Sequence, residues 1–340
     1  METPTYRYLL PLAATVALLA GCSSPTETPE ATEAPASGNG YPVRIENRGR
    51  TVTVPAAPSR AATIDQSATE IMLSLGLADR MAGTAGWNDT VLPELAAANE
   101  QVPAIGQKTV SLERLLDADP DFVYATFDWS FSEEGVGSRD RFDGFGVPTY
   151  QSPSECGGQT AARDRALTLQ DMYDEIAEIA TVFDAKDRGD QLITDLRSRD
   201  GDATGADTTE DVSLMWWYAA TRTPYIAGCC GAPGIITDAV GAAHPFADSR
   251  QYWPEISWES ILERDPDVLV LADLARGDDG DSAAAKIEFL ESNPVARQLT
   301  AVKERRWIIR SGTAMDPSIH NIGAIETVAS GLREMDFAGR

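Results

Sequence analysis

The stretch Ser111-Leu-Glu113-Arg-Leu-Leu-Asp-Ala-Asp119-Pro120-Asp121-Phe-Val has a counterpart at Ser257-Trp-Glu259-Ser-Ile-Leu-Glu-Arg-Asp265-Pro266-Asp267-Val-Leu. Each copy reads as a helical turn with a serine cap, an Asp-Pro-Asp stop and an apolar run. Solenoid repeats recur every ~20–50 residues, and these two copies lie much further apart. The repeat therefore predicts a duplicated lobe, with one glutamate at the same point of each lobe.

Short apolar strands alternate with amphipathic helices around both copies. Strands are expected at 61–64, 81–85, 122–126 and 147–150 in the first half, and at 212–218, 268–272 and 307–309 in the second. Strand-helix alternation of this kind is typical of parallel sheets flanked by helices. A hairpin is expected before them at 41–55, and amphipathic helices at 166–183 and 184–199 separate the halves. The sequence thus predicts an α/β protein with two parallel-sheet lobes and a ligand cleft between them.

Composition narrows the class of partner. The chain has 340 residues, 43% of them hydrophobic, with 28 Lys+Arg against 53 Asp+Glu and a formal net charge of −25. This hydrophobic content suffices for folded cores. The acidic balance argues against nucleic acid or an anionic membrane surface as a partner.

The amino-terminal segment reads as an export signal. An apolar run over 9–20 ends in Leu19-Ala20-Gly21-Cys22, which resembles a bacterial lipobox. We expect a signal peptide at 1–21, lipidation of Cys22, and a Pro/Thr/Glu-rich tether at 22–40. An ordinary signal peptide with an incidental cysteine is the alternative.

Three cysteines remain, namely Cys156, Cys229 and Cys230. An exported location permits disulfides, so we expect Cys156 to pair with Cys229 or Cys230. The alternative is a soft-metal site, whose enzymatic version would be chelatase-like and would use Cys229, Cys230 and His244. No Gly-x-Ser-x-Gly elbow, P-loop or His-Glu-x-x-His motif accompanies them, so we predict that the protein is not an enzyme.

A family resemblance rests on the order of several motifs. The lipobox, the tether, the segment 55–64, Ser67-Ala-Thr-Glu70-Ile and the two Asp-Pro-Asp phrases resemble the substrate-binding lipoproteins of ABC importers for ferric siderophores and cobalamin. The resemblance covers roughly 41–335. It implies Rossmann-like lobes at 41–183 and 201–340 that are joined by one long helix at 184–200 and close only slightly on a ligand.

The resemblance also implies partners and cargo. The expected partners are a permease homodimer or heterodimer with its ATPase, and the expected place is the outer side of a bacterial cell membrane, held by the lipid anchor. The cargo would be a metal chelate, most simply a ferric siderophore, with cobalamin, haem or another large cofactor as alternatives. No intrinsic cofactor and no metal site of the protein's own are expected.

Two sets of site residues follow. Glu113 and Glu259 match the family's permease-docking glutamates, and a role as capping-box partners is the alternative. Glu70 is expected in the first turn of a helix, where the helix dipole favours it. Because large chelates need aromatic faces and a few polar groups, ligand contacts are sought at strand ends. The candidates are Gln66, Trp87, Phe127, Trp129, Arg139, Tyr218, Arg222, Tyr225, Tyr252 and Trp253, followed by Arg141 and Met315.

Overall fold

The computed structural model describes residues 40–154, 165–204, 212–274 and 276–337. The predicted signal peptide, the lipidation site Cys22, the tether up to Asn39 and the cysteine Cys156 lie outside these residues. Within the described ranges, no helix is long and apolar enough to span a bilayer.

The amino-terminal lobe is built on a four-stranded parallel sheet. Its strands are β3 (Ala61–Ile64), β4 (Met81–Ala85), β5 (Phe122–Ala125) and β6 (Thr149–Gln151), in the order β4-β3-β5-β6. A hairpin of β1 (Val43–Asn47) and β2 (Arg50–Val54) precedes the sheet, with Arg48 and Gly49 at positive φ in its turn, as the sequence predicts. The helices of this lobe are α1 (Gln66–Ser74), α2 (Ala96–Asn99), α3 (Leu112–Asp117) and α4 (Arg139–Phe145), with short 3₁₀ turns η1 (Ala78–Arg80), η2 (Pro93–Leu95) and η3 (Asp128–Phe131).

The carboxy-terminal lobe repeats the arrangement. Its sheet has the order β10-β9-β7-β8, formed by β7 (Leu214–Ala219), β8 (Tyr225–Ile226), β9 (Val268–Asp273) and β10 (Trp307–Ser311). β8 is a short antiparallel edge strand, and the other pairings are parallel. The expected α/β class with two parallel-sheet lobes is confirmed. The helices here are α7 (Ala232–Ala239), α8 (Trp258–Arg264), α9 (Ala283–Ser292), α10 (Thr300–Lys303) and α11 (His320–Glu334), with η4 (Ala296–Gln298) and η5 (Thr313–Met315).

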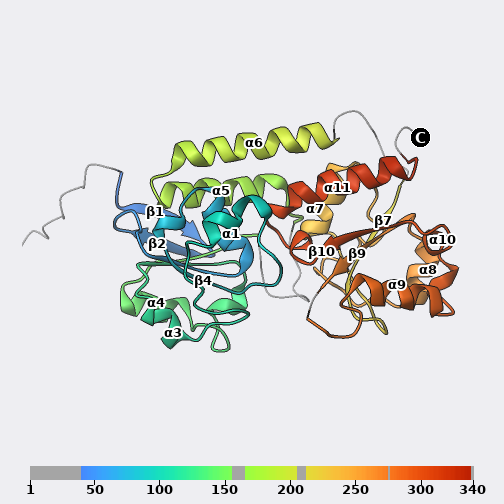
Figure 1. Cartoon of the computed structure of the whole chain (residues 1–340), viewed down its shortest axis with the longest axis horizontal. Coiled ribbons are helices and arrows are strands. Elements are labelled where there is room, and N and C mark those ends of the chain that lie inside the picture. The colour runs from blue at the N-terminus through green and yellow to red at the C-terminus, as the bar shows by residue number, and fades with distance from the viewer. Residues whose placement is uncertain (1–39, 155–164, 205–211, 275, 338–340) are drawn as a thin grey trace, which may run out of the picture.

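Two consecutive helices lead from one lobe to the other. α5 (Leu169–Val182) packs beneath α6 (Lys186–Thr204), and the far part of α6 packs on α11 of the carboxy-terminal lobe. Figure 1 shows α6 lying along the top of the molecule above both lobes. Ile193 and Leu196 are the apolar side chains that α6 buries. The domain limits proposed from the sequence remain a prediction.

The repeated phrase has the same structural task in both lobes. The first aspartate of each Asp-Pro-Asp, Asp119 at φ 50° and Asp265 at φ 38°, adopts the left-handed conformation just beyond its helix. Asp121 accepts a hydrogen bond from Ser59 Oγ at 3.0 Å, and Asp267 accepts one from Ser213 Oγ at 2.6 Å. In each lobe the second aspartate therefore fastens the start of one central strand to the start of its neighbour.

The two adjacent tryptophans of β7 serve two different cores. Trp216 is buried in the cluster that contains α7, α11 and the amino-terminal lobe's helices, whereas Trp217 is buried in the cluster beneath α8 and α9. Successive side chains of a strand point to opposite faces, so one strand supplies both layers. Both tryptophans are therefore core residues.

Candidate functional site

A cavity of about 230 Å³ lies between the lobes, at the carboxyl ends of their central strands. Ligands of open α/β folds bind at this edge of the sheet. Both lobes contribute to its walls, which consist of Asn88, Phe127 and Trp129 from the first lobe and Tyr218, Tyr252, Trp253, Asp273, Leu274, Arg276, Gly312, Thr313, Met315, Asp316 and Pro317 from the second.

The amino-terminal wall is a pair of stacked rings just beyond β5. Phe127 and Trp129 lie with ring centroids 6.0 Å apart and planes 16° apart. Asp65, which follows β3 at φ 81°, holds this loop. Its carboxylate accepts hydrogen bonds from the backbone N–H groups of Thr126 and Phe127 at 3.2 Å each and from Ser130 Oγ at 2.8 Å. The buried Asp65 thus fixes the ring pair through the backbone that carries it.

The carboxy-terminal wall is a second aromatic pair. Tyr218 at the end of β7 and Trp253 have ring centroids 4.8 Å apart. The neighbouring Tyr252 donates from its hydroxyl to the carbonyl oxygen of Ser154 at 2.8 Å, which joins this wall to the other lobe. Two aromatic pairs that line one cavity suit a large ligand with extended apolar or π surface.

Among the described residues that line the cavity, all the charged ones belong to the second lobe. They are Asp273, Arg276 and Asp316. Burial, followed by repulsion from Asp65, raises the pKa of Asp316 to about 7. Burial also raises the pKa of Asp65 to about 6, although its three hydrogen bonds oppose the shift.

A buried pair bridges the lobes next to the cavity. His320 Nε2 at the start of α11 contacts Glu70 Oε2 on α1, and the two side chains are 7% and 0% exposed. The other oxygen of Glu70 accepts hydrogen bonds from Gln66 Nε2 at 3.0 Å and from the backbone N–H of Leu92 at 3.1 Å. Glu70 lies beyond the first turn of α1, so the expected helix-dipole role is wrong. The contact with His320 of the other lobe, and not the helix dipole, explains why a carboxylate occupies position 70.

Half of the ten ligand candidates line the cavity: Phe127, Trp129, Tyr218, Tyr252 and Trp253, together with Met315. Their contact with a ligand stays a prediction.

The other five do not line it. Arg139 is buried elsewhere and donates to the hydroxyl and carbonyl oxygens of Thr149 at 2.9 and 2.8 Å. Gln66 holds the loop behind Asn88, because its Oε1 accepts from the backbone N–H of Asp89 at 3.0 Å. Trp87 is half-buried, Arg222 is exposed, and Tyr225 bonds to Glu255. Gln66, Trp87 and Arg222 follow strands as predicted, whereas Arg139 begins α4 and Tyr225 lies in β8.

The two matched glutamates are both exposed at helix starts, Glu113 on α3 and Glu259 on α8. Each is the second helical residue after its serine cap, whereas a capping box needs an acidic or amide residue at the third. The capping interaction instead runs from the serine oxygen to the backbone N–H of Arg114 or Ser260, at 3.2 Å in both lobes. The capping-box alternative is therefore wrong, and neither carboxylate has a partner among the described residues.

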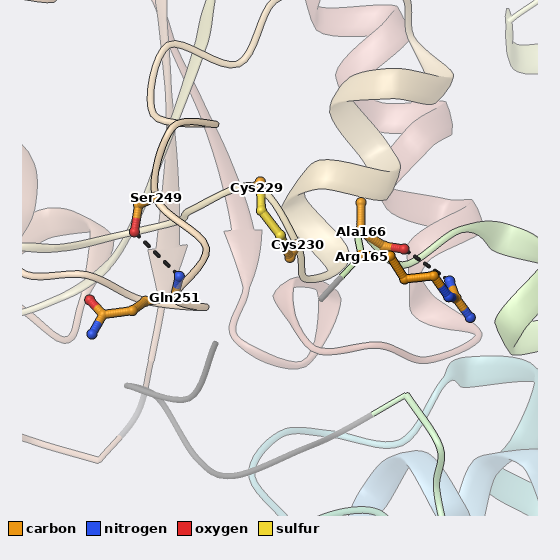
Figure 2. The surroundings of a disulfide bond; sticks show 6 residues. All are labelled: Arg165, Ala166, Cys229, Cys230, Ser249 and Gln251. Carbon is orange, nitrogen blue, oxygen red and sulfur yellow. Dashed lines mark hydrogen bonds between the residues drawn. A yellow bond between two sulfur atoms is a disulfide. The ribbon is translucent and has the colours of Figure 1, made fainter. Parts of the chain in front are cut away.

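The cysteine pairing also differs from the expectation. Cys229 and Cys230 form a disulfide with each other at the start of α7, where the sequence predicts a pairing of one of them with Cys156, which lies outside the described residues. Figure 2 shows this disulfide between the segment of Ser249 and Gln251 and that of Arg165 and Ala166. Backbone hydrogen bonds hold both sides, from Cys229 N–H to Ser249 O at 2.9 Å and from Leu167 N–H to Cys230 O at 3.3 Å.

The chelatase-like alternative loses its ligands in this arrangement. Disulfide sulfurs are not thiolates, and the thiolate is the metal-binding form of cysteine. Among the described residues, no group of three His, Cys, Asp or Glu side chains is placed to hold a metal ion.

Sequence reasoning missed the charged residues of the cavity. Asp273 ends β9 and Arg276 follows it, much as Phe127 and Trp129 follow β5, so the duplication itself marks that strand end. Asp316 follows η5 after β10, where the sequence carries no comparable signal.

Comparison with known protein families and sequences gives a consistent result. The family model described as "Periplasmic binding protein" matches residues 62–310. The chain is 26% identical over 270 residues to the vitamin B12-binding protein of Vibrio parahaemolyticus, covering 78% of this chain and 86% of that protein. It is 23% identical over 294 residues to an uncharacterized ABC transporter substrate-binding lipoprotein of Bacillus subtilis, covering 85% and 84%.

Solved structures share the fold. A periplasmic binding protein from Veillonella parvula superimposes with a TM-score of 0.75 at 23% identity, covering 86% of this chain and 97% of that chain. An ABC-type Fe³⁺-hydroxamate transport system structure from Saccharomonospora viridis gives a TM-score of 0.71 at 24% identity, covering 86% and 99%.

Proposed function

Because the chain belongs to the periplasmic binding protein family, we propose that it captures a ferric siderophore in its inter-lobe cavity and delivers it to a permease. The family consists of non-enzymatic, extracytoplasmic substrate-binding proteins of ABC transporters for siderophores, vitamin B12 or haem. The observation that carries the proposal is the cavity with opposed aromatic walls from two lobes.

Size supports a siderophore over the other cargoes. Small-molecule sites usually have volumes of ~300–1,000 Å³, and this cavity, at about 230 Å³, lies below that range. A compact ferric chelate needs less widening of the cleft than vitamin B12 does. The structural relative named for Fe³⁺-hydroxamate transport has the same two-lobed fold.

Titration with defined chelates tests the cargo. We expect a ferric trihydroxamate to quench tryptophan fluorescence saturably at one ligand per protein, and Trp129→Ala to weaken its binding at least about tenfold because half of the stacked ring pair is lost. Trp129 is 43% exposed, so its removal leaves the core intact. The matched control is Phe145→Ala, which truncates a 49% exposed ring of the same lobe outside the cavity and should leave affinity unchanged.

Native mass spectrometry of the same protein with cobalamin and with haem tests the two alternative cargoes. Saturable binding of either, without binding of ferric chelates, would reassign the cargo. Binding of a free divalent metal alone would contradict the chelate proposal.

We propose Glu113 and Glu259 as the contacts to the permease. Both are exposed and unpartnered in the described part of the chain, and α3 and α8 lie toward opposite outer ends of the molecule (Figure 1). Exposed charges contribute more to register and association rate than to affinity. We expect Glu113→Arg with Glu259→Arg to leave chelate binding intact and to reduce uptake into cells at least about tenfold.

The control for this double variant is Glu100→Arg with Glu288→Arg, which makes the same charge change at one exposed glutamate of each lobe. Uptake at the normal rate by the Glu113/Glu259 variant, or equal loss in the control, would refute the docking role.

The lipid anchor at Cys22 is also part of the proposal. It rests on the lipobox at the end of the apolar run and on the B. subtilis lipoprotein relative. Mass spectrometry of the mature amino terminus tests it directly: an unmodified residue there would contradict it.

A further inference from the structure

The inter-lobe cavity carries an unbalanced negative charge. Its charged lining residues are two carboxylates, Asp273 and Asp316, and one guanidinium, Arg276, among the residues that the structure describes. Whether the guanidinium is available to a ligand therefore decides the sign of charge that the cavity prefers.

Arg276 is already neutralised by a carboxylate outside the cavity. Its Nη2 donates to Asp281 Oδ1 at 2.6 Å and its Nε donates to Asp281 Oδ2 at 3.3 Å. The Asp281 side chain is only 2% exposed, so this partner is fixed in place. The guanidinium also lies over the ring of Tyr218, 5.4 Å from its centroid. An anionic ligand would have to compete with a two-point ion pair in which the guanidinium is 37% exposed and the carboxylate 2% exposed.

Asp316 is the opposite case. Its backbone is held because its carbonyl oxygen accepts a hydrogen bond from Asn321 Nδ2 at 2.9 Å. Its half-buried carboxylate accepts no hydrogen bond among the described residues. A carboxylate that is removed from water without a donor is costly, and a bound cation would remove that cost.

The titratable and charged groups around Asp316 come from every side of the cleft. They are Asp65 after β3, His320 at the start of α11 with its partner Glu70 on α1, and Arg276 after β9. Asp65 disfavours a second negative charge, whereas His320 and Arg276 favour it. Each of these two groups already contacts another carboxylate, Glu70 or Asp281, and neither donates a hydrogen bond to the carboxylate of Asp316 among the described residues.

The walls add a second preference for positive charge. The aromatic side chains of Phe127, Trp129, Tyr218 and Trp253 line the same cavity, and the Tyr218 ring already lies beneath the guanidinium of Arg276. Aromatic faces attract ammonium and alkylammonium groups through the ring quadrupole.

From these observations we propose that the cleft selects cargo bearing a positive charge, and that Asp316 receives an ammonium group of the chelate between the aromatic walls. This inference rests on the proposed chelate-binding function and narrows it to ferric chelates of the alkylammonium trihydroxamate class.

One chelate in three charge states provides the test. The ferric complex of desferrioxamine B carries one positive charge, its N-acetyl derivative none and its N-succinyl derivative one negative charge. We expect affinity to fall about tenfold or more at each step in fluorescence titrations at pH 8, because the first step removes the attraction between the ammonium group and Asp316 and the second adds a repulsion between two carboxylates. Asp316→Asn should reduce each step to about threefold or less, since it removes the charge and keeps the shape.

Asp117→Asn removes one exposed negative charge on α3, far from the cavity, and should keep the full preference. Equal affinity for the cationic and anionic chelates, or an unchanged preference in Asp316→Asn, would overturn the inference while leaving chelate binding established. If none of the three chelates binds, the trihydroxamate cargo is wrong. The charge selection is then decided by benzyltrimethylammonium against benzylsulfonate, and preferential binding of the sulfonate would overturn it.

Discussion

His320→Ala should lower the free energy of unfolding by roughly 2–4 kcal/mol, because it leaves a fully buried carboxylate without one of its partners. Glu70 is 0% exposed and would retain only the donors from Gln66 Nε2 and the Leu92 backbone. The pair joins α1 of one lobe to α11 of the other, so its loss weakens the lobe interface as well as the local packing. Urea unfolding followed by circular dichroism measures the change.

The exposed ion pair between Arg199 on α6 and Glu326 on α11 supplies the control. Its two hydrogen bonds are both 2.8 Å long, but its side chains are 45% and 40% exposed. Solvent screens such a pair, and Arg199→Ala should cost at most about 1 kcal/mol. A cycle of Glu70→Gln, His320→Gln and the double variant isolates the coupling. A His320→Ala protein as stable as Arg199→Ala would show that the inter-lobe pair contributes nothing.

The fold could be predicted because its determinants are local and occur twice. The strand-helix alternation and the Asp-Pro-Asp phrase each lie within short windows of sequence. Their structural reasons are equally local: a left-handed aspartate ends the helix, and the next aspartate reaches a serine on the neighbouring strand. Because the pattern occurs in both halves of the chain, the prediction for one half supports the prediction for the other.

The site could be predicted only in part, because its polar chemistry depends on distant partners. Aromatic residues after strands are visible in sequence, and five of them meet in one cavity. The pairing of Glu70 with His320 spans 250 positions, and that of Tyr252 with Ser154 spans 98. Sequence periodicity and motif spacing do not predict contacts between residues so far apart in the chain. Arg139 and Gln66 do not line the cavity, because Arg139 donates to Thr149 and Gln66 accepts from the backbone N–H of Asp89.

The unpartnered carboxylate of Asp316 has a thermodynamic consequence that is independent of cargo. Burial and Asp65 raise its pKa to about 7 from an ordinary value of 3.8. Folding therefore favours its protonated form. The stability that this protonation contributes is present below about pH 4, declines as the pH rises and is lost above about pH 7. A buried carboxylate without a hydrogen-bond donor lowers the stability of the unliganded protein, and binding sites commonly contain such destabilising groups because function requires them.

Asp316→Asn should accordingly stabilise the protein at pH 8 and not at pH 4. One pKa unit corresponds to about 1.4 kcal/mol, and solvent in the open cleft reduces the full shift, so we expect a gain of roughly 1–3 kcal/mol at pH 8. Thermal unfolding of both proteins between pH 4 and pH 8 measures it, with Asp117→Asn as the exposed control that should show no such trend. The gain at pH 8 should accompany the loss of cation preference in the same variant, because both follow from one uncompensated carboxylate. A variant that is less stable than the parent at pH 8 would mean that Asp316 is already balanced within the fold, and it could then have no charge to offer a ligand.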